Sequence, residues 1–393
     1  MHLDQNEYYG GEEAAVSLPE AEAWVDRFAA AKEHARFSHA SITRTDGQDD
    51  TDKPRLASAR AYSLSLAPQL IYARSALVPA IVSSRTHNQV DFQAVGSWFL
   101  VDHDGSGSTT LTRVPSSREG VFQDKSLDLK ARRPLMKFLM FVKDEADKLE
   151  TWEEYKDTPF PAFLQQKFRL QPTSHGPILA LTMSDKTPES TTTGYVVPRI
   201  ARHLRSIGVF GPGFGAVLPK WGGLAEIAQV ACRACAVGGG VYVLNKGIKE
   251  AERQLEGGSI SLELSGSEKV STTRLVGGQD DMPTSLHKTK AGPTSTTASS
   301  RSISIVSSPL TSLFPPTSEG GVTPAGAVVV VIPSAGREEP PVHILVHTSD
   351  AGECPMNQCK YLQFLFVCSP LRRLTCALMN LIFEYLSTLS ELY

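Results

Sequence analysis

A helical pattern that breaks at three glycines and resumes as a strand constrains the fold of this 393-residue chain most strongly. It reads EIAQVACRACAVGGGVYVLN over residues 226–245. Ile227, Val230 and Ala234 recur at helical spacing, and an extended apolar run begins at Val241. A glycine run between two such patterns favours a tight turn, because glycine adopts backbone conformations that other residues avoid. The pattern therefore predicts a helix that leads directly into a strand.

The beginning of the chain has the pattern of a strand, a YYGG turn and a helix over residues 18–30. In a dinucleotide-binding fold, an acid such as Asp4 ends the second strand of the first βαβ unit, and a glycine-rich turn with its helix precedes it. Nothing before Asp4 in this sequence matches that unit of about 30 residues. We therefore expect the sheet to lack its first βα unit.

Composition narrows the class of protein. A hydrophobic content of 41% and a charged content of 21% predict a globular protein long enough for two or more domains. A net charge of −3 provides no general attraction to nucleic acid or to anionic membranes. Six cysteines without a secretory pattern at the start predict reduced thiols and a cytoplasmic location.

The most apolar stretch, residues 361–381, is interrupted by Pro370, Arg372 and Arg373. A membrane-spanning helix needs about 20 mainly apolar residues, so a buried helix pair, or a sequence artefact, is the better interpretation. We expect any membrane contact to be peripheral.

The predicted organisation is an α/β domain interrupted by a helical one. A strongly amphipathic pattern over residues 127–149 predicts a long helix, with further helices before the chain returns to strand patterns. We therefore predict a discontinuous α/β domain I over residues 1–114 and 209–393, and an inserted all-α domain II over 115–208.

Two patterns dominate the last third of the chain. Serine, threonine, proline and glycine are enriched in residues 283–325, and we predict a largely disordered linker over residues 255–325. The runs AVVVVI at 327–332 and VHILV at 342–346 predict buried strands.

Polar residues on the helix before the glycines form the first candidate site. The spacing of Glu226, Gln229 and Arg233 places them on one helix face. A solvated polar face is the plainer interpretation. The context favours binding instead, because alternate residues Val241 and Val243 of the following strand can flank the same surface.

Together with the segment DQNEYYGGEEAAVS near the start, these residues resemble the family of Rab escort proteins and Rab GDP-dissociation inhibitors. The resemblance implies a flavoprotein-like α/β sheet domain, degenerate for its cofactor, that carries an inserted helical domain. In that family the matching motif forms the platform for the GTPase switch regions. The resemblance therefore implies this role for Tyr9, Glu226, Arg233, Val241 and Val243.

A second pair of residues distinguishes an escort protein from a dissociation inhibitor within this family. Phe122 and Arg133 lie eleven residues apart, about three helical turns. A phenylalanine before an amphipathic helix is usually a staple into its own core. In escort proteins, however, the matching Phe and Arg dock the prenyltransferase, and dissociation inhibitors lack the Phe. Phe122 and the CRAC sequence at 232–235 thus favour an escort protein.

The resemblance implies a carrier and not an enzyme. It would bind GDP-bound Rab GTPases, present them to the Rab geranylgeranyltransferase α/β heterodimer, shield the attached geranylgeranyl lipid and deliver the product to membranes. Leaving the lipid exposed to water is unfavourable by roughly 0.8 kcal/mol per CH₂. We predict that the pocket for the lipid lies at Phe138, Leu139 and Val142. The alternatives are a Rab GDP-dissociation inhibitor and, more distantly, a flavin-dependent oxidoreductase.

Other chemistry receives little support from the sequence. Cys232, Cys235, Cys354 and Cys359 have the number of thiolates that a zinc site needs, but the first two fit packing within a helix better. No Gly-x-Gly-x-x-Gly opens a helix, and neither a Gly-x-Ser-x-Gly nor a His-Glu-x-x-His motif occurs. We predict no catalytic residue, no metal and no cofactor.

Overall fold

The computed structural model describes residues 1–30, 37–43, 56–67, 69–103, 109–115, 129–254, 258–278, 281–283, 299–315, 325–334 and 340–366. Its helices are α1 (Leu18–Ala29), α2 (Leu77–Ser83), α4 (Leu129–Glu145), α5 (Phe160–Phe163), α6 (His175–Ala180), α7 (Thr193–Ser206) and α8 (Leu224–Val237). Its strands are β1 (His2–Leu3), β2 (Ala15–Val16), β3 (Leu64–Ser65), β4 (Ile71–Tyr72), β5 (Phe92–His103), β6 (Thr109–Val114), β7 (Ala216–Pro219), β8 (Tyr242–Val243), β9 (Ile248–Arg253), β10 (Ile260–Leu264), β11 (Lys269–Thr272), β12 (Ser299–Val306), β13 (Ala327–Ile332), β14 (Val342–Thr348) and β15 (Cys359–Phe366).

A mixed sheet of eight strands is the largest in the described part of the chain. Its order is β12-β15-β14-β13-β5-β7-β4, with β6 paired to β5. Strand β13 runs parallel to β5, and the other pairings are antiparallel. The strand predicted at 327–332 is confirmed, because β13 begins and ends at the same residues. All six of its residues are buried, as expected for an apolar strand that lies between two other strands. The run at 342–346 is likewise confirmed as part of β14.

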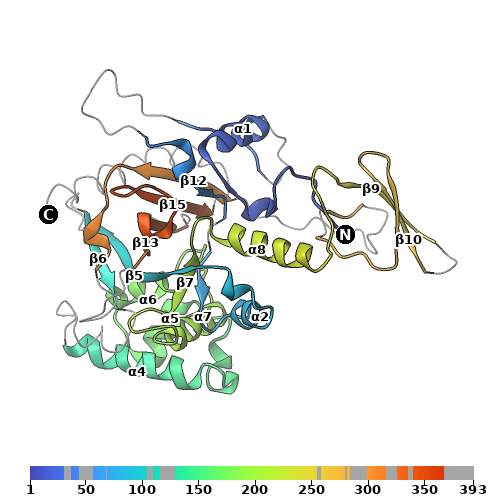
Figure 1. The fold of residues 1–393 in the computed structure, drawn as a ribbon. Coiled ribbons are helices and arrows are strands. Elements are labelled where there is room, and N and C mark those ends of the chain that lie inside the picture. Colours follow the sequence, from blue (N-terminus) through green and yellow to red (C-terminus); the bar gives the residue numbers. More distant parts are fainter. Residues whose placement is uncertain are drawn as a thin grey trace.

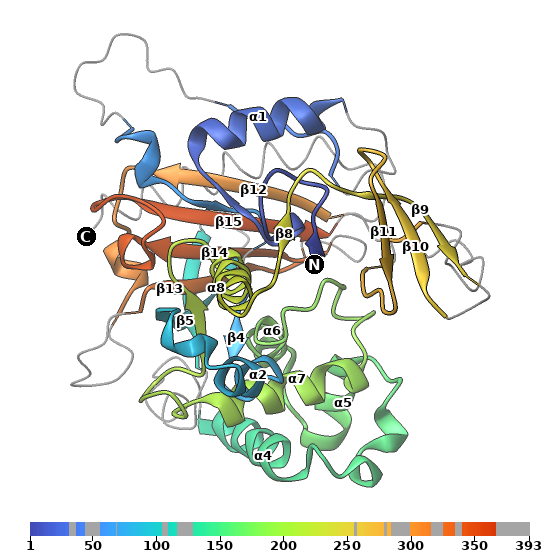
Figure 2. The same cartoon turned by 45° about the vertical axis from the view of Figure 1, so that its right-hand side comes forward.

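Helices cover the sheet on two sides. Figures 1 and 2 show α1 on one side and the group α4 to α7 on the other, with the small sheet β9-β10-β11 projecting at the end where the N-terminus lies. Helix α1 begins where Ser17 and Glu20 form a capping box, with the Ser17 amide donating to the Glu20 carboxylate at 2.7 Å. None of the described helices is both long enough and apolar enough to cross a lipid bilayer.

The group α4 to α7 has an aromatic core of its own. The Phe138 ring lies 5.9 Å from that of Phe160 and 5.3 Å from that of Phe168. Strands β5 and β6 precede this group in the chain and β7 follows it, so the chain leaves the large sheet and returns to it. Residues 116–128 are not described, and the boundaries 1–114, 115–208 and 209–393 stay predictions.

The predicted linker at 255–325 is wrong for a large part of its length. Strands β10, β11 and β12 all lie within it. In β12, Ile303 and Ile305 alternate with serines, and both pack against the apolar cluster around Ala14 and Val16. The many serines obscured an alternation of apolar and polar residues. This alternation indicates a strand, because one face of the strand packs against the apolar cluster.

The interpretation of residues 361–381 as a helix pair or an artefact is also wrong where it can be judged. Tyr361 is buried in strand β15, which pairs with β12 on one side and β14 on the other. The rest of that stretch, from residue 367 onward, lies outside the described residues.

A buried ionic cluster fastens the last strands to the segment before β3. Glu353 and Lys360 form an ion pair with side chains that are 0% exposed, and His347 contacts the same Glu353 oxygen. Lys360 also donates to the Ser63 carbonyl at 3.0 Å, and the Ser63 amide donates to the Glu353 carbonyl at 3.1 Å. Burial raises the pKa of the Glu353 carboxyl, but Lys360 and His347 outweigh it and hold the pKa at about 2.

The loop at residues 351–353, which contains Glu353, also contacts the segment just before α8. The Trp221 amide donates to the Ala351 carbonyl at 2.8 Å, two residues before Glu353. Gly352 has φ +74°, and a Cβ there would lie 2.4 Å from the Trp221 ring, so the contact requires glycine. The ionic cluster therefore stabilises the loop on which α8 starts.

We predict that Lys360→Met lowers the free energy of unfolding by about 3–5 kcal/mol, because it leaves a buried carboxylate without its partner. Denaturant titration would measure it, with Lys249→Met in the exposed Lys249–Glu263 pair as the matched control. An equal effect of the two substitutions would contradict the role assigned to the cluster.

The pH dependence follows from the lowered pKa of Glu353. Its folded-state pKa of about 2 lies below the ordinary value of 4.5. The stabilisation is therefore fully present above that ordinary value and is lost as the pH falls toward about 2. In Glu353→Gln, the loss of unfolding free energy that comes from protonation of Glu353 at low pH should disappear.

Candidate functional site

The parallel pair β1–β8 brings the start of the chain to the end of α8. His2 pairs with Tyr242, and the His2 amide donates to the Val241 carbonyl at 2.8 Å. The Asp4 amide donates to the Val243 carbonyl at 3.0 Å. Figure 1 shows the N-terminus beside the end of α8 that faces the small sheet. Two segments more than two hundred residues apart thus form one local surface.

Three aromatic side chains gather on one face of this pair. The His2 and Tyr242 rings stack at 4.9 Å, and Tyr9 meets Tyr242 edge-on at 5.6 Å. Tyr9 reaches this position because the turn after it has Gly10 at φ +97°, a conformation that glycine adopts readily. Register partners in a parallel pair share a face, as the stacked His2 and Tyr242 do.

The aromatic face continues onto α8 through two thiols. The Tyr242 hydroxyl donates to the Cys235 sulfur, and this hydrogen bond, with burial, raises the pKa of Tyr242 to about 12. Burial and the neighbouring Cys232 raise the pKa of Tyr9. Cys235 is exposed and Cys232 is half-buried, so both contacts lie near the surface.

The predicted platform residues are only partly brought together. Tyr9 contacts Cys232, the neighbour of the exposed Arg233 on α8. Burial raises the pKa of the Glu226 carboxyl, and the charge of Arg233 offsets part of this effect. Glu226 and Arg233 thus lie on α8, and Tyr9 reaches that helix at Cys232.

The two predicted strand residues lie differently. Successive side chains of a strand point to opposite faces, so Val241 and Val243 lie on the face away from Tyr242 and Tyr9. Val241 is 58% exposed and Val243 is half-buried.

Sequence reasoning missed Tyr242 and His2, and it noted the two thiols without placing them at this surface. The period-two pattern of the strand contained the signal for Tyr242, which lies between the two predicted valines. Nothing in the local sequence could have indicated His2, because its contact depends on long-range strand pairing.

A close approach at Gly240 sets the angle between α8 and β8. The Gly240 amide donates to the Cys235 carbonyl at 2.9 Å. A Cβ at this position would lie 2.6 Å from the Cys235 sulfur and 2.9 Å from its carbonyl oxygen. The helix can therefore run into the strand without a spacer only because residue 240 lacks a side chain.

The other predicted residues lie on α4 or before it. Arg133 is exposed on α4, whereas Phe122 lies outside the described residues. Phe138 and Val142 are 0% exposed and Leu139 is 9% exposed. All three pack into the aromatic core of the α4–α7 group.

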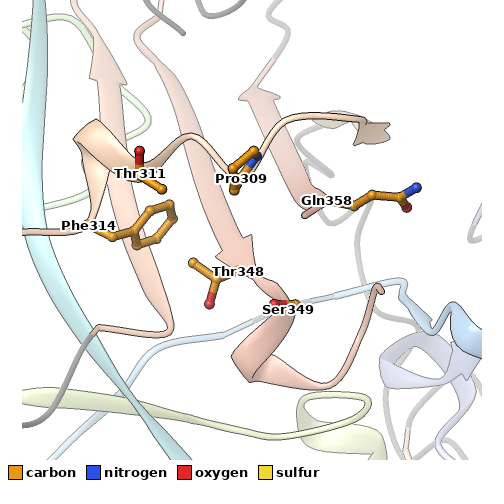
Figure 3. A pocket seen from close by; sticks show the side chains of 6 residues that line it. All are labelled: Pro309, Thr311, Phe314, Thr348, Ser349 and Gln358. Carbon is orange, nitrogen blue, oxygen red and sulfur yellow. The ribbon is translucent and has the colours of Figure 1, made fainter. Parts of the chain in front are cut away.

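A cavity of about 180 Å³ lies elsewhere in the fold. Figure 3 shows the side chains that line it, those of Pro309, Thr311, Phe314, Thr348, Ser349 and Gln358. Small-molecule sites usually span roughly 300–1,000 Å³, so this cavity is too small to enclose a long lipid chain. It also lies against β14 and β15, far in the chain from the residues predicted to line the lipid pocket.

The site offers little to a cofactor or metal. One Asp4 carboxylate oxygen accepts hydrogen bonds from the backbone amide and the side-chain amide of Asn6, at 2.9 and 3.0 Å. The Asp4 carboxylate therefore stabilises the local turn. Within the described ranges, no group of three or more His, Cys, Asp or Glu could hold a metal ion. Burial raises the pKa of the Cys354 thiol to about 11 and that of Cys359 to about 12.

Comparison with known proteins gives the family. The GDP dissociation inhibitor (GDI) family matches residues 1–320. Rab proteins geranylgeranyltransferase component A of Candida albicans is 29% identical over 251 residues, which are 64% of this chain and 38% of that protein. The chain thus spans less than half the length of this relative.

Solved structures give the fold. The crystal structure of Rab GDI from Plasmodium falciparum has a TM-score of 0.65 at 18% identity, covering 96% of this chain and 79% of that one. An oxidoreductase from Methanosarcina mazei has a TM-score of 0.54 at 10% identity, covering 84% and 74%. These likenesses confirm the predicted α/β class with a flavoprotein-like sheet.

The fold and the helix–glycine–strand site define a protein of the Rab GDI and escort class. The chain belongs to the GDP dissociation inhibitor family, which confirms the resemblance found in the sequence.

We predict that Gly240→Ala lowers the free energy of unfolding by about 1–3 kcal/mol, because the new Cβ displaces Cys235 and the end of α8. Gly247→Ala is the matched control, since its Cβ would meet only Gln5, at an ordinary 3.7 Å. Denaturant titration of both variants would measure the difference. A Gly240→Ala protein as stable as the control would show that the close approach is not needed.

Proposed function

We propose that this chain is the GTPase-binding part of a Rab escort protein. It binds GDP-bound Rab proteins, presents them to the Rab geranylgeranyltransferase α/β heterodimer, and passes the prenylated product to membranes for vesicle transport. The observation that carries the proposal is that the β1–β8 pair brings Tyr9 against Cys232 of α8, whose neighbour in the chain is the exposed Arg233. Family membership and the relative named component A of the transferase support it.

The chemistry of the α8 end suits a protein partner. Tyrosine and arginine are the residue types that most often dominate binding energy at interfaces. Beside them, Val237 is 86% exposed and Val241 is 58% exposed, so apolar area is available for burial. Because Val241 and Val243 lie on the opposite face of β8, we assign them to the rim of the surface and Tyr242 to its centre.

The lipid is proposed to bind at Phe138, Leu139 and Val142. These side chains already fill the core between α4, α5 and α7, so a geranylgeranyl chain must separate these helices to reach them. Aromatic and aliphatic side chains can repack around a lipid at small cost, because one apolar contact replaces another. Binding would then be coupled to opening of the helical group.

Docking of the transferase is proposed at Arg133 and Phe122. Arg133 and Lys137 lie one turn apart and are both exposed on α4, so a partner can reach their charges. Arginine recognises a partner carboxylate through two parallel hydrogen bonds. The protein itself acts as a substrate-presenting subunit in the cytosol, with peripheral membrane contact and no catalytic residue, cofactor or nucleic-acid partner.

Two alternatives differ in what they require. A Rab GDP-dissociation inhibitor recycles prenylated GTPases without the transferase, so Phe122 and the CRAC sequence of α8 argue for the escort role. A flavin-dependent oxidoreductase requires an acid that is free to bind the cofactor ribose, whereas the Asp4 carboxylate is engaged with Asn6.

A reconstituted prenylation assay tests the proposal. We expect lipid transfer to GDP-loaded Rab by purified geranylgeranyltransferase to depend on this chain, and to fall in Arg133→Ala and in Phe122→Ala. Lys249→Ala, on β9, is the surface control. Transfer that is absent while the folded chain still binds prenylated Rab would move the assignment to a dissociation inhibitor.

Binding measurements separate the two proposed surfaces. Tyr9→Ala and Arg233→Ala should each weaken binding of both prenylated and unprenylated Rab by about tenfold or more, the usual scale for central interface residues. Leu139→Gln should weaken binding of the prenylated form alone, with Met140→Gln, at an exposed neighbour, as its control. Equal loss of both forms in Leu139→Gln would contradict the lipid pocket.

A further inference from the structure

The proposed function does not use the two thiols of α8. Cys232 and Cys235 are free, lie three residues apart, and are half-buried and exposed respectively. By contrast, Cys354 and Cys359 are buried. Of these four described cysteines, oxidants and thiol reagents in solution therefore reach the α8 pair first.

Helical spacing brings the pair almost within bonding distance. Residues three apart on an α-helix have Cα atoms about 5 Å apart, inside the range of roughly 4.4–6.8 Å that disulfides allow. Their Cβ atoms are about 5–6 Å apart, whereas a disulfide needs roughly 3.5–4.5 Å. Closing the bond must therefore tighten the last turn of α8 by an ångström or more.

The glycine turn after α8 is the end of the helix at which the last turn can tighten. Gly238 to Gly240 follow the helix directly, and Gly239 has φ +92° with no atom within 4 Å of a Cβ placed there. The preceding turns of α8 are anchored by buried Leu224, Ala225 and Val230. Tightening would move the glycine turn and β8 and leave the helix start in place.

Both sulfurs already have partners on the aromatic face. Cys235 accepts the hydrogen bond of Tyr242 and lies against Gly240, while Cys232 contacts Tyr9. Turning the sulfurs toward each other withdraws them from both tyrosines. The state of the thiols is thus coupled to the position of Tyr9 and Tyr242.

We propose that Cys232 and Cys235 form a reversible disulfide that displaces Tyr9 and Tyr242 and so weakens GTPase binding. The oxidant is a low-molecular-weight disulfide such as oxidised glutathione. One cysteine thiolate attacks it and releases one glutathione thiol; the second thiolate then attacks the mixed disulfide and releases another. Two cysteine thiols are oxidised and one glutathione disulfide is reduced to two thiols. The effect on binding rests on the proposed function, whereas the disulfide does not.

The disulfide is tested on the full chain alone. Trypsin cleaves after Arg233, between the two cysteines, so residues 221–233 and 234–246 stay joined only if the disulfide has formed. After treatment with oxidised glutathione and alkylation, we expect this linked peptide pair, and its separation by dithiothreitol. Cys354 and Cys359 should be alkylated only after unfolding. Absence of the linked pair would overturn the proposal.

The coupling is tested by binding of GDP-loaded Rab to the same samples. We expect oxidation to weaken binding by about tenfold, dithiothreitol to restore it, and Cys235→Ser to bind equally well with and without oxidant. Unchanged affinity in a sample that contains the linked pair would overturn the regulatory role. Lack of binding by the reduced, folded chain would instead refute the proposed function, and the peptide test would still decide whether the disulfide forms.

Discussion

Backbone pairing between the first residues and the segment after α8 is the interaction on which the candidate site depends. Amide-to-carbonyl bonds join His2 to Val241 and Asp4 to Val243, and further bonds join Asn245 to Asn6 and Lys246 to Asp4. Such bonds are short-range and directional, so they determine the register of both strands at once. Without them the tyrosines of one segment would have no defined position relative to the helix of the other.

The large sheet supports this arrangement from the opposite end of α8. The cluster of Glu353, Lys360 and His347 is buried, and a buried charge is tolerated only with its partners in place. The cluster therefore favours a single arrangement of the loop that receives Trp221. The start of α8 is held by the hydrogen bond from the Trp221 amide to the Ala351 carbonyl, and its end passes into the glycine turn at residues 238–240.

Much of the fold was open to prediction wherever the pattern was local and strong. The run AVVVVI matched β13 at both ends, because a strand buried on both faces needs uninterrupted apolar residues. Within the candidate site, Tyr9, Glu226 and Arg233 were predicted from spacing and resemblance, and their role stays a prediction. Glu226 and Arg233 lie on α8, and Tyr9 lies beside Cys232 of that helix. Prediction failed at 255–325, where Ile303 and Ile305 were concealed among serines, and only pairing with β15 makes that segment a strand.

The sequence by itself determined the helix, the glycine break and the strand between residues 226 and 245, and with them the family. These features depend on periodicity and backbone freedom, which neighbouring residues set. The tertiary structure decided which face of β8 meets Tyr9, and it selected Tyr242 over the two valines. It also decided that His347, Glu353 and Lys360 meet. The first outcome depends on the register between β1 and β8, which are distant in sequence, and the second on the register between β14 and β15, in which His347 pairs with Lys360. A one-residue shift of register would turn every side chain to the other face.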